Sequence, residues 1–477
     1  MTAVPLIVDL DGTLIKTDML HECAFRLARE HPLAALQLPL WLAQGKAAMK
    51  ARMAPLARFD PAALPYTEPF VAWLREQKAQ GRRLILCTAS DRAWAEPIAV
   101  HLGLFDEVIA SDGQTNLAGA QKAQRLVERF GERGFDYAGN ATPDLAVWRH
   151  ARRAVLVNAP PALAAQAESM GEVEQRFALD AAGPRAWARV LRLHQWLKNL
   201  LIFVPLLAAH QMFSGPAWLA LLPAFLAYGL CASAVYIAND LLDLESDRQH
   251  PRKRERPFAA GRVPLWQGAL LCPLLLAASA ALAWSVGREF SLWLALYFVA
   301  TCAYSWGLKR VVLIDCLILA MLYTLRIIAG AAAANLFLSF WLLAFSVFLF
   351  LSLAFVKRYA ELDVQLQQGR TQAHGRGYFT SDAPLVQTFG IASGYAAVLV
   401  LALYLNSQEV LELYATPELV WAAVPVLLFW VSWMWLQAHR GLMHDDPLIY
   451  AVKDRASLAA GAVFAGVLAL GTVGWPW

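Results

Sequence analysis

Charged residues are scarce in this chain, and that scarcity limits the classes of protein to which it can belong. Asp, Glu, Lys and Arg make up 16% of the 477 residues, whereas 58% are hydrophobic. A soluble globular domain has about 25% charged residues, so the composition excludes an ordinary soluble protein. Residues 1 to about 190 mix charges, prolines and short apolar runs, and serial apolar stretches follow from Leu197. The sequence therefore predicts one soluble domain followed by one membrane domain.

Paired cysteines and a leader-like N-terminus are lacking as well. The six cysteines include no C-x-x-C pair, and four of them lie in apolar runs (Cys231, Cys272, Cys302 and Cys316). This pattern predicts reduced, buried thiols and no disulfide framework. The first residues have no basic region and reach Asp9 too early for a signal peptide.

The second half of the chain contains nine apolar stretches, most of them long enough to cross a hydrocarbon core of about 30 Å. We predict spans at approximately 197–211, 217–238, 265–286, 290–308, 312–333, 336–356, 384–405, 417–437 and 456–475. The loops after the second, fourth, sixth and eighth spans together hold 15 Lys and Arg, and the other four hold only Arg288. By the positive-inside rule the basic loops and the soluble domain are cytoplasmic. We expect an integral protein of a bacterial-type inner (plasma) membrane.

In the soluble domain, polar residues follow each predicted strand. Residues 4–8 form a short apolar run that leads directly into Asp9 and Asp11, and a second run, 84–87, ends at Thr88. Lys122 comes later, and a third apolar stretch leads into Gly-Asn-Ala-Thr-Pro-Asp at 139–144. Strands of this kind, separated by helical stretches, indicate a parallel sheet with its site at the carboxyl ends of the strands.

These residue types suit phosphoryl transfer. A carboxylate at Asp9 can attack phosphorus and form an aspartyl phosphate, and Asp11 can serve as general acid and then general base. Thr88 and Lys122 can hold phosphoryl oxygens, while Asp144 helps to hold Mg²⁺.

The order of these motifs resembles the haloacid dehalogenase (HAD) phosphatases over residues 4–158. The resemblance implies an α/β fold with a parallel sheet, phosphatase activity, and Mg²⁺ held by Asp9, Asp11, Asp144 and residue 140. One motif departs from the family, whose fourth motif usually begins Gly-Asp, because Asn140 stands at the second position. An Asn carbonyl can bind Mg²⁺, although more weakly than a carboxylate. The alternative is a degenerate domain kept for binding or stability.

We place the HAD-like domain at residues 1–158, with a small helical cap at about 14–83 and a linker at 159–190. The linker assignment rests on an Ala- and Pro-rich composition. Within the cap, the apolar run 31–43 has two interpretations that the sequence leaves open. It rests on the bilayer or the membrane domain, or it is buried inside the cap.

The most informative part of the second half lies between Asn239 and Gly261, where the second span ends. Asn239, Asp243 and Asp247 are four residues apart, so they share one face if the helix continues beyond the span. Asp240 and Glu245 lie beside them. Carboxylates this close need a divalent cation or raised pKa values. Six basic residues accompany them, which suits a multiply charged anion (Arg248, Arg252, Lys253, Arg254, Arg256 and Arg262). Together the two groups predict Mg²⁺ that holds a diphosphate.

The pattern N-D-x-x-D-x-x-x-D, followed by R-P-x-x-A-G at 256–261, resembles the UbiA prenyltransferase superfamily over residues 191–477. The resemblance implies an all-α membrane domain of about nine transmembrane helices. It also implies that the Asp-rich loop binds Mg²⁺ and, through it, the diphosphate of a donor. The alternative is an acidic helix end beside a basic patch that only sets the topology.

Many members of that superfamily carry a second D-x-x-x-D after the sixth span, and this chain lacks it. The cations Lys357 and Arg358 stand near its place. Extra cations suit a donor with an additional phosphate, such as phosphoribosyl diphosphate. The segments 192–199, 304–309 and 444–447, which contain Lys198 and Lys309, resemble the decaprenyl-phosphate phosphoribosyltransferase branch.

The resulting hypothesis is an enzyme that joins a soluble diphosphate donor to a polyprenyl phosphate in the membrane, with no nucleic acid as partner. Mg²⁺ would lie on Asp240, Asp243 and Asp247, with Asn239 orienting the cluster. The donor phosphates would be bound by basic residues from several segments (Lys198, Lys253, Arg256, Lys309, Lys357 and Arg358). The HAD-like domain would then remove the 5-phosphate of the product. The sequence does not predict an oligomeric state.

Two other functions use the same features. The first is prenyl transfer from a polyprenyl diphosphate to an aromatic acceptor such as a hydroxybenzoate, which the missing second Asp motif disfavours. The second is a membrane scaffold in which only the HAD-like domain is catalytic. Arg326, inside the fifth span, lines a lipid-phosphate pocket or pairs with a carboxylate for packing.

Overall fold

A computed structural model of the chain describes residues 4–178, 182–371, 376–407, 413–443 and 446–474. Its contacts divide it into two compact units. The first comprises Met1–Leu191 together with Tyr236–Pro273, and the second comprises Arg192–Val235 together with Leu274–Trp477. The Asp-rich segment therefore belongs to the same unit as the N-terminal fold.

The first unit is built on a parallel sheet, as predicted. Its six strands are β1 (Leu6–Val8), β2 (Leu84–Asp91), β3 (Glu107–Ser111), β4 (Asp136–Gly139), β5 (Arg153–Val157) and β6 (Glu172–Phe177). They lie in the order β3-β2-β1-β4-β5-β6 and every neighbouring pair is parallel. The chain changes direction across the sheet between β1 and β4, and open α/β sheets bind their ligands at the carboxyl ends of the strands at such a point. Asp9 follows β1 and Asn140 follows β4.

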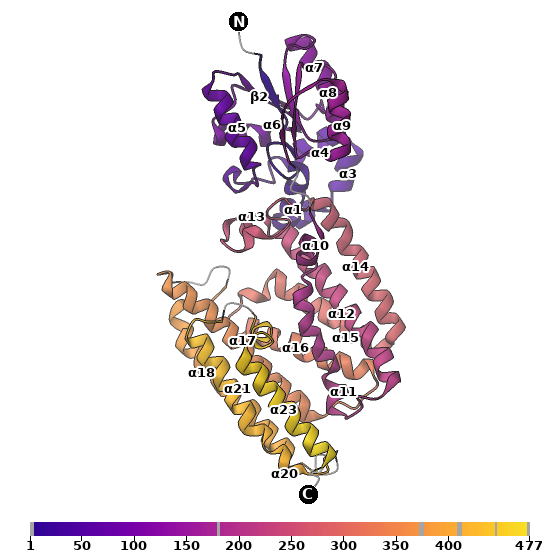
Figure 1. Cartoon of the computed structure of the whole chain (residues 1–477), viewed down its shortest axis with the longest axis vertical. Helices are drawn as coiled ribbons and strands as arrows, with labels where there is room; N and C mark the ends of the chain where they lie inside the picture. Colours follow the sequence, from indigo (N-terminus) through magenta and orange to yellow (C-terminus); the bar gives the residue numbers. More distant parts are fainter. Residues whose placement is uncertain (1–3, 179–181, 372–375, 408–412, 444–445, 475–477) are drawn as a thin grey trace. The chain divides into compact units, whose positions relative to one another are not determined.

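Helices cover both faces of this sheet because successive strand residues point to opposite sides. Leu6 and Val8 join a core with α5 (Glu68–Ala79) and α6 (Arg92–Leu102). Ile7 joins a second core with helices on the other face, namely α7 (Ala120–Phe130), α8 (Leu145–Trp148) and α9 (Pro161–Met170). In Figure 1, α7, α8 and α9 lie on one side of the strands and α5 lies on the other.

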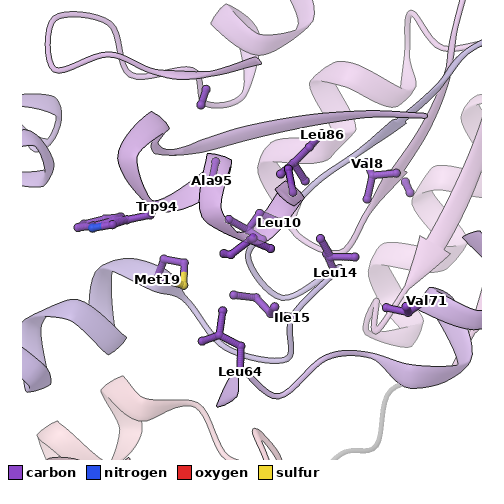
Figure 2. Packing of buried hydrophobic residues seen from close by; sticks show 14 of the residues in the cluster. Val8, Leu10, Leu14, Ile15, Met19, Leu64, Val71, Leu86, Trp94 and Ala95 are labelled. Atoms are coloured by element: carbon purple, nitrogen blue, oxygen red, sulfur yellow. The ribbon is translucent and has the colours of Figure 1, made fainter. Parts of the chain in front are cut away.

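Short helices between β1 and α5 form the cap. They are α1 (Met19–Glu30), α2 (Pro32–Ala35), α3 (Leu38–Ala43), α4 (Lys46–Met53) and the 3₁₀ turn η1 (Pro61–Ala63). Asp18 caps α1, because its carboxylate accepts from the N–H groups of Leu20 and His21. Figure 2 shows Leu10, Ile15 and Leu64 gathered beside Met19 at the start of α1. The predicted cap, 14–83, was too long at its end, because α5 packs against the sheet.

The apolar run 31–43 is mostly on the surface of the first unit. Leu33, Leu36 and Leu40 are each at least 66% exposed, whereas Trp41 is buried in the cap. Only the Trp41 side of this run therefore fits the interpretation of a buried cap helix.

The predicted linker at 159–190 needs correction. Residues 161–170 form α9, and β6 follows at Glu172–Phe177 as the last strand of the sheet, paired with β5. The strand was missed because it lies at an edge and its sequence, E-V-E-Q-R-F, has no continuous apolar run. Helix α10 (Pro184–Val190) completes the segment.

Helices make up the second unit, and α12 and α14 cross the boundary between the units. The segments are η3 (Leu193–Phe203), α11 (Val204–Ala208), α12 (Gly215–Leu242), α14 (Leu265–Val286), α15 (Arg288–Trp306), α16 (Ile314–Ala333), α17 (Phe340–Gln367), α18 (Ala383–Leu405), α20 (Pro417–Val420), α21 (Ala423–His439), α22 (Pro447–Ala451) and α23 (Arg455–Val473). Over the described ranges, seven helical segments are long and apolar enough to cross a membrane.

Two of the nine predicted spans are therefore not confirmed. The span at 197–211 corresponds to η3 and α11, which together form a shorter apolar segment, Leu193–Ala208. The span at 290–308 corresponds to α15, whose 19 residues begin with Arg288 and Glu289 and have a lower mean hydropathy as a result. The remaining seven spans match the helical segments in order, and the prediction of a helical membrane domain is confirmed.

Candidate active sites

The first candidate site lies at the carboxyl ends of β1, β2 and β4. Lys122, from the first turn of α7, donates to Asp9 at 2.6 Å and to the hydroxyl of Tyr137 at 3.0 Å. Tyr137 in turn donates to Asp144 at 2.7 Å. The sheet thus brings together the predicted nucleophile, the predicted lysine and the predicted last acid through one hydrogen-bonded chain.

Asp11 lies in the same loop and is held by three donors. The backbone N–H of Met19 donates at 2.8 Å, the Ser90 hydroxyl at 2.7 Å and the Thr88 hydroxyl at 3.4 Å. Burial raises the pKa of Asp11 to about 6, with the charge of Asp18 adding to the effect. A carboxyl group that titrates near neutral pH is suited to give and take a proton.

Asp9 has a raised pKa for a similar reason. Burial raises the pKa of Asp9 to about 7, against the opposing positive charge of Lys122. The charges of Asp144 and Asp11 also raise it. A bound divalent cation would offset this repulsion, so the electrostatics of the group fit the predicted metal.

Asn140 lies against the first motif. Its side-chain oxygen accepts from the Thr13 hydroxyl at 3.2 Å. Gly12 has φ +76°, and a Cβ there would lie 2.1 Å from the Asn140 amide nitrogen, so this contact requires glycine. Asp144 accepts from the backbone N–H groups of Asn140 and Ala141, each at 2.9 Å.

The described residues contain no group of three His, Cys, Asp or Glu side chains placed to hold a metal ion. A Mg²⁺ ion in this site would therefore need oxygen ligands beyond the carboxylates. The Asn140 carbonyl, water and substrate phosphate are such ligands, and Mg²⁺ usually keeps several of its waters.

Sequence reasoning missed Lys50, a residue of the cap that reaches this site. Its ammonium group donates to the Ala89 carbonyl at 2.5 Å and to the Asn116 side chain at 3.1 Å. Burial lowers the pKa of Lys50, while Asp11 and Asp18 act in the opposite direction. In the sequence K-A-A-M-K-A-R-M, no feature distinguishes this buried lysine from the exposed basic residues Lys46 and Arg52.

The second candidate site is the Asp-rich segment. Helix α12 ends at Leu242 and α13 (Leu244–Gln249) begins after Asp243, so the single continuous helix that we considered is interrupted there. The interruption is slight, because the Asp243 N–H still bonds to the Asn239 carbonyl at 2.9 Å and the Asp247 N–H to the Asp243 carbonyl at 2.8 Å.

Arg256 bridges two of the predicted metal ligands. Its guanidinium lies 3.0 Å from Asp240 and 2.6 Å from Asp247, and both carboxylates are buried. Burial raises the pKa of Asp247, although Arg256 lowers it. Two buried carboxylates that converge on one cation fit Mg²⁺, because this ion is usually bound by one or two carboxylates together with substrate phosphates.

Asp243 does not join that pair. It lies 3.1 Å from Arg29, near the end of α1. Lys253 lies on the surface, in the short 3₁₀ turn η4 (Lys253–Glu255).

In the second unit, Lys198 and Lys357 converge on one acid. The carboxylate of Asp446 lies 2.7 Å from the Lys198 ammonium and 3.5 Å from that of Lys357. The Tyr323 hydroxyl donates to the same carboxylate at 2.9 Å. Burial raises the pKa of Asp446, but the two ammonium groups outweigh it and hold the pKa well below its usual range.

Arg358 occupies a different cluster. It is fully buried, lies 2.5 Å from Asp315, and also pairs with Glu361. Tyr378 donates to Asp315 as well. Two carboxylates thus pair with Arg358, and its predicted role in donor binding stays a prediction.

Of the remaining predicted residues, Lys309 lies in η5 (Leu308–Arg310), where its carbonyl accepts from Arg376. Two residues of the 444–447 segment, His444 and Asp445, lie outside the described residues.

Arg326 is buried in α16, where several of its contacts are with neutral polar groups. It donates to the Asn199 side chain and to the Tyr297 hydroxyl, each at 2.9 Å, and to the Leu322 carbonyl. Its guanidinium also lies 4.7 Å from the centre of the Tyr297 ring. These contacts connect α16 with η3 and α15.

The fold and motifs define an integral membrane protein with a transferase-type helical domain and an N-terminal hydrolase-type domain. Residues 200–458 match the UbiA prenyltransferase family, and residues 6–147 match the haloacid dehalogenase-like hydrolases. The chain belongs to the UbiA prenyltransferase family and carries a HAD-like domain at its N-terminus, as the motifs predicted.

Three curated relatives match different shares of the chain. The chain is 39% identical to the uncharacterized protein y4nM of Sinorhizobium fredii over 470 residues. This alignment covers 98% of the chain and 91% of the relative. It is 37% identical over 287 residues to the nodulation protein NoeC of Azorhizobium caulinodans (58% of this chain, 92% of the relative). It is also 37% identical over 187 residues to the decaprenyl-phosphate phosphoribosyltransferase of Mycolicibacterium smegmatis (38% of this chain, 58% of the relative).

Proposed function

We propose that the membrane domain transfers a 5-phosphoribosyl group from phosphoribosyl diphosphate to a polyprenyl phosphate. The observation that carries this proposal is the 37% identity to a decaprenyl-phosphate phosphoribosyltransferase across the UbiA region. The pairing of Lys198 and Lys357 supports it, because two ammonium groups held by one acid suit a donor with more phosphate than a prenyl diphosphate has.

The reaction needs little covalent chemistry from the protein. A phosphate oxygen of the lipid attacks C1 of the ribose as the bond between C1 and the diphosphate oxygen breaks. The diphosphate leaves with the bonding electron pair, and a new C1–O–P linkage joins ribose to lipid. Alignment and neutralisation of charge supply most of the rate in such a reaction.

Asp240 and Asp247 would hold the metal, and Asn239 and Asp243 complete the predicted set. Mg²⁺ would neutralise the leaving diphosphate. Arg256 lies between the two buried acids and would bind a phosphate oxygen when the acids bind metal. Lys253 and Lys309 are the remaining basic residues of the proposed donor site.

We propose that the HAD-like domain then removes the 5-phosphate of this product. The Asp9 carboxylate attacks phosphorus, the bond from phosphorus to the ribose 5-oxygen breaks, and that oxygen takes a proton from Asp11. Asp11 then accepts a proton from water, whose oxygen attacks the aspartyl phosphate and releases inorganic phosphate. Lys122 and Thr88 would hold the phosphoryl oxygens, with Asn140 and Asp144 at the metal.

Both steps would take place on one side of the membrane. The basic loops and the N-terminal domain are proposed to be cytoplasmic, in an inner membrane, as the distribution of Lys and Arg predicts.

A donor assay tests the transferase. Membranes with the full-length protein receive Mg²⁺ and either labelled phosphoribosyl diphosphate with polyprenyl phosphate, or labelled polyprenyl diphosphate with an aromatic acceptor. We expect label in lipid only from the ribosyl donor. Label on the aromatic acceptor would favour prenyl transfer, and absence of transfer would favour a scaffold.

A pair of variants adds specificity to this assay. Asp247→Asn removes a buried carboxylate at nearly constant shape and should abolish transfer. Glu255→Gln, an exposed acid eight residues further along, serves as the matched control and should leave transfer unchanged.

A further inference from the structure

The Asp-rich segment is built into the HAD-like fold of the first unit by a buried ion pair. Glu22 of α1 lies 2.5 Å from Arg248 of α13, and these side chains are 10% and 7% exposed. Arg248 also donates to the Ala259 carbonyl at 2.9 Å, so it connects α1 to the loop that carries R-P-x-x-A-G. One turn further along α1, Arg26 pairs with Glu245.

The loop itself comes very close to the first HAD motif. Gly261 has φ +67°, and a Cβ at this position would lie 2.6 Å from the Cβ of Lys16. Only glycine combines this backbone conformation with such a close approach. The loop is therefore fitted to the HAD-like fold at Lys16, five residues beyond Asp11.

A cavity of about 620 Å³ opens between them. Its lining includes Asp11 and Asn140 at the catalytic end, Lys16 and Arg262 as cations, and Trp187 and Trp266 as apolar surfaces. The volume falls within the range of about 300–1,000 Å³ typical of small-molecule sites.

The lining places two cations, Lys16 and Arg262, away from Lys122, the cation of the phosphoryl site. The phosphoryl group attacked by Asp9 already has Lys122 beside it. The acids Asp11 and Asp18 also line the cavity, but each accepts hydrogen bonds from the start of α1. Lys16 and Arg262 line the same cavity as two indole rings, a combination that suits a second anionic group followed by an apolar chain.

We propose that this cavity binds an amphiphile with two phosphates, a terminal phosphomonoester at its Asp11 and Asn140 end and a phosphodiester at Lys16 and Arg262, with the start of its lipid chain along Trp187 and Trp266. This inference rests on the proposed function, since the transfer product has that pattern of groups. The loop of the transferase thereby completes the substrate site of the phosphatase, and Arg262 and Trp266 determine its specificity.

The test compares two synthetic substrates on the full-length protein in detergent, ribose 5-phosphate and geranyl-phosphoribosyl 5-phosphate. We expect Arg262→Ala to raise KM for the amphiphile by about tenfold or more and to change KM for ribose 5-phosphate less than about twofold. Arg262→Lys should recover much of the loss. Arg185→Ala, an exposed arginine of α10 outside the lining, is the matched control and should change neither KM.

The outcomes separate this inference from the proposed function. Hydrolysis of both substrates with equal KM, or an equal effect of Arg262→Ala on both, would overturn the inference and leave the phosphatase chemistry standing. Absence of hydrolysis of either substrate by the wild-type chain would overturn both. Because the substrates are supplied ready-made, the result does not depend on the transferase step.

Discussion

At the scale of single residues, the HAD-like site depends on a buried ion pair. Lys122 and Asp9 lie 2.6 Å apart, and both side chains are almost inaccessible to solvent. Removal of one partner leaves an uncompensated charge in the interior. That arrangement costs much more than a surface pair is worth.

Lys122→Met should therefore abolish phosphatase activity and lower the stability of the first unit by about 3–5 kcal/mol. Thermal unfolding and hydrolysis assays of the full-length protein measure the two effects. Lys78→Met is the matched control, because Lys78 pairs with Asp106 at the surface and should contribute less than about 1 kcal/mol. Equal destabilisation by the two variants would contradict the proposed difference.

Asn140→Asp restores the acid that usually follows this glycine in HAD phosphatases. The added carboxylate lies in a site whose charges already raise the pKa of Asp9, so we expect a lower melting temperature without metal. With Mg²⁺ the variant should gain more melting temperature than the wild type, because metal binds the folded state more tightly. A Mg²⁺ titration of the thermal transition measures this.

The same titration of Asn335→Asp, an exposed position in the second unit, is the control. Identical Mg²⁺ shifts for the wild type and Asn140→Asp would show that residue 140 is not at the metal.

At this scale the sequence predicted which polar residues lie at the strand ends, because short motifs such as D-x-D-G-T combine residue type with a fixed position after a strand. It could not predict Lys50, whose partners are 39 and 66 residues away. The burial of Arg358 was not predicted for the same reason. Its partner Asp315 is distant in sequence, and a buried arginine looks like an exposed one until that partner is known.

At the scale of elements, α1 and α13 form a charge-complementary contact within the first unit. Glu22, Arg26 and Arg29 occupy one face of α1, since they are four and three residues apart. They face Arg248, Glu245 and Asp243, in that order, so every pair has opposite charges.

Reversing one charge should loosen this contact. Glu22→Arg or Arg248→Glu alone places like charges together, and we expect trypsin to cleave the exposed basic residues 252–254 about tenfold faster. The double variant restores opposite charges and should return the rate toward that of the wild type. Mass spectrometry of the fragments identifies the cleavage site, and a double variant cleaved as fast as either single variant would contradict the pairing.

Asp446 connects η3, α16 and α17 through Lys198, Tyr323 and Lys357. Asp446→Asn removes the charge that holds the two lysines, so we expect KM for phosphoribosyl diphosphate to rise about tenfold with a smaller change in kcat. Steady-state transfer kinetics with both substrates measure this. Asp363→Asn, which affects an acid near the surface of α17, is the control.

Elements with strong periodic or apolar patterns were predicted, and weakly patterned ones were not. Seven spans match helices because long apolar runs have one structural solution in a membrane. Strand β6 was taken for linker because an edge strand does not need apolar residues. A span was predicted at 197–211, where the structure has the shorter segment Leu193–Ala208, because composition does not distinguish a 3₁₀ stretch from an α-helix.

At the scale of the whole molecule, both proposed reactions depend on the same metal. Chelation of Mg²⁺ with EDTA should stop ribosyl transfer and phosphate release together, and added Mg²⁺ should restore both. Ca²⁺ should restore little, because it prefers longer bonds and more ligands than these small oxygen sets offer. Loss of one activity alone would show that the other site works without a metal.

The relative y4nM matches both parts of the chain, so the joined arrangement is not peculiar to this protein. Sequence alone predicted two parts from the change in apolarity. It did not predict that residues 236–273 belong with the N-terminal fold, because a contact surface made of ion pairs has the composition of any charged surface.

Helix α1 makes contacts with both candidate sites of the first unit. Its first N–H holds Asp11 at 2.8 Å, and Arg29, in its last turn, holds Asp243 at 3.1 Å. The 12-residue helix, about 18 Å long, thus contacts one predicted residue of each candidate site. A change in the position of this one helix would therefore alter the surroundings of Asp11 and of Asp243 together.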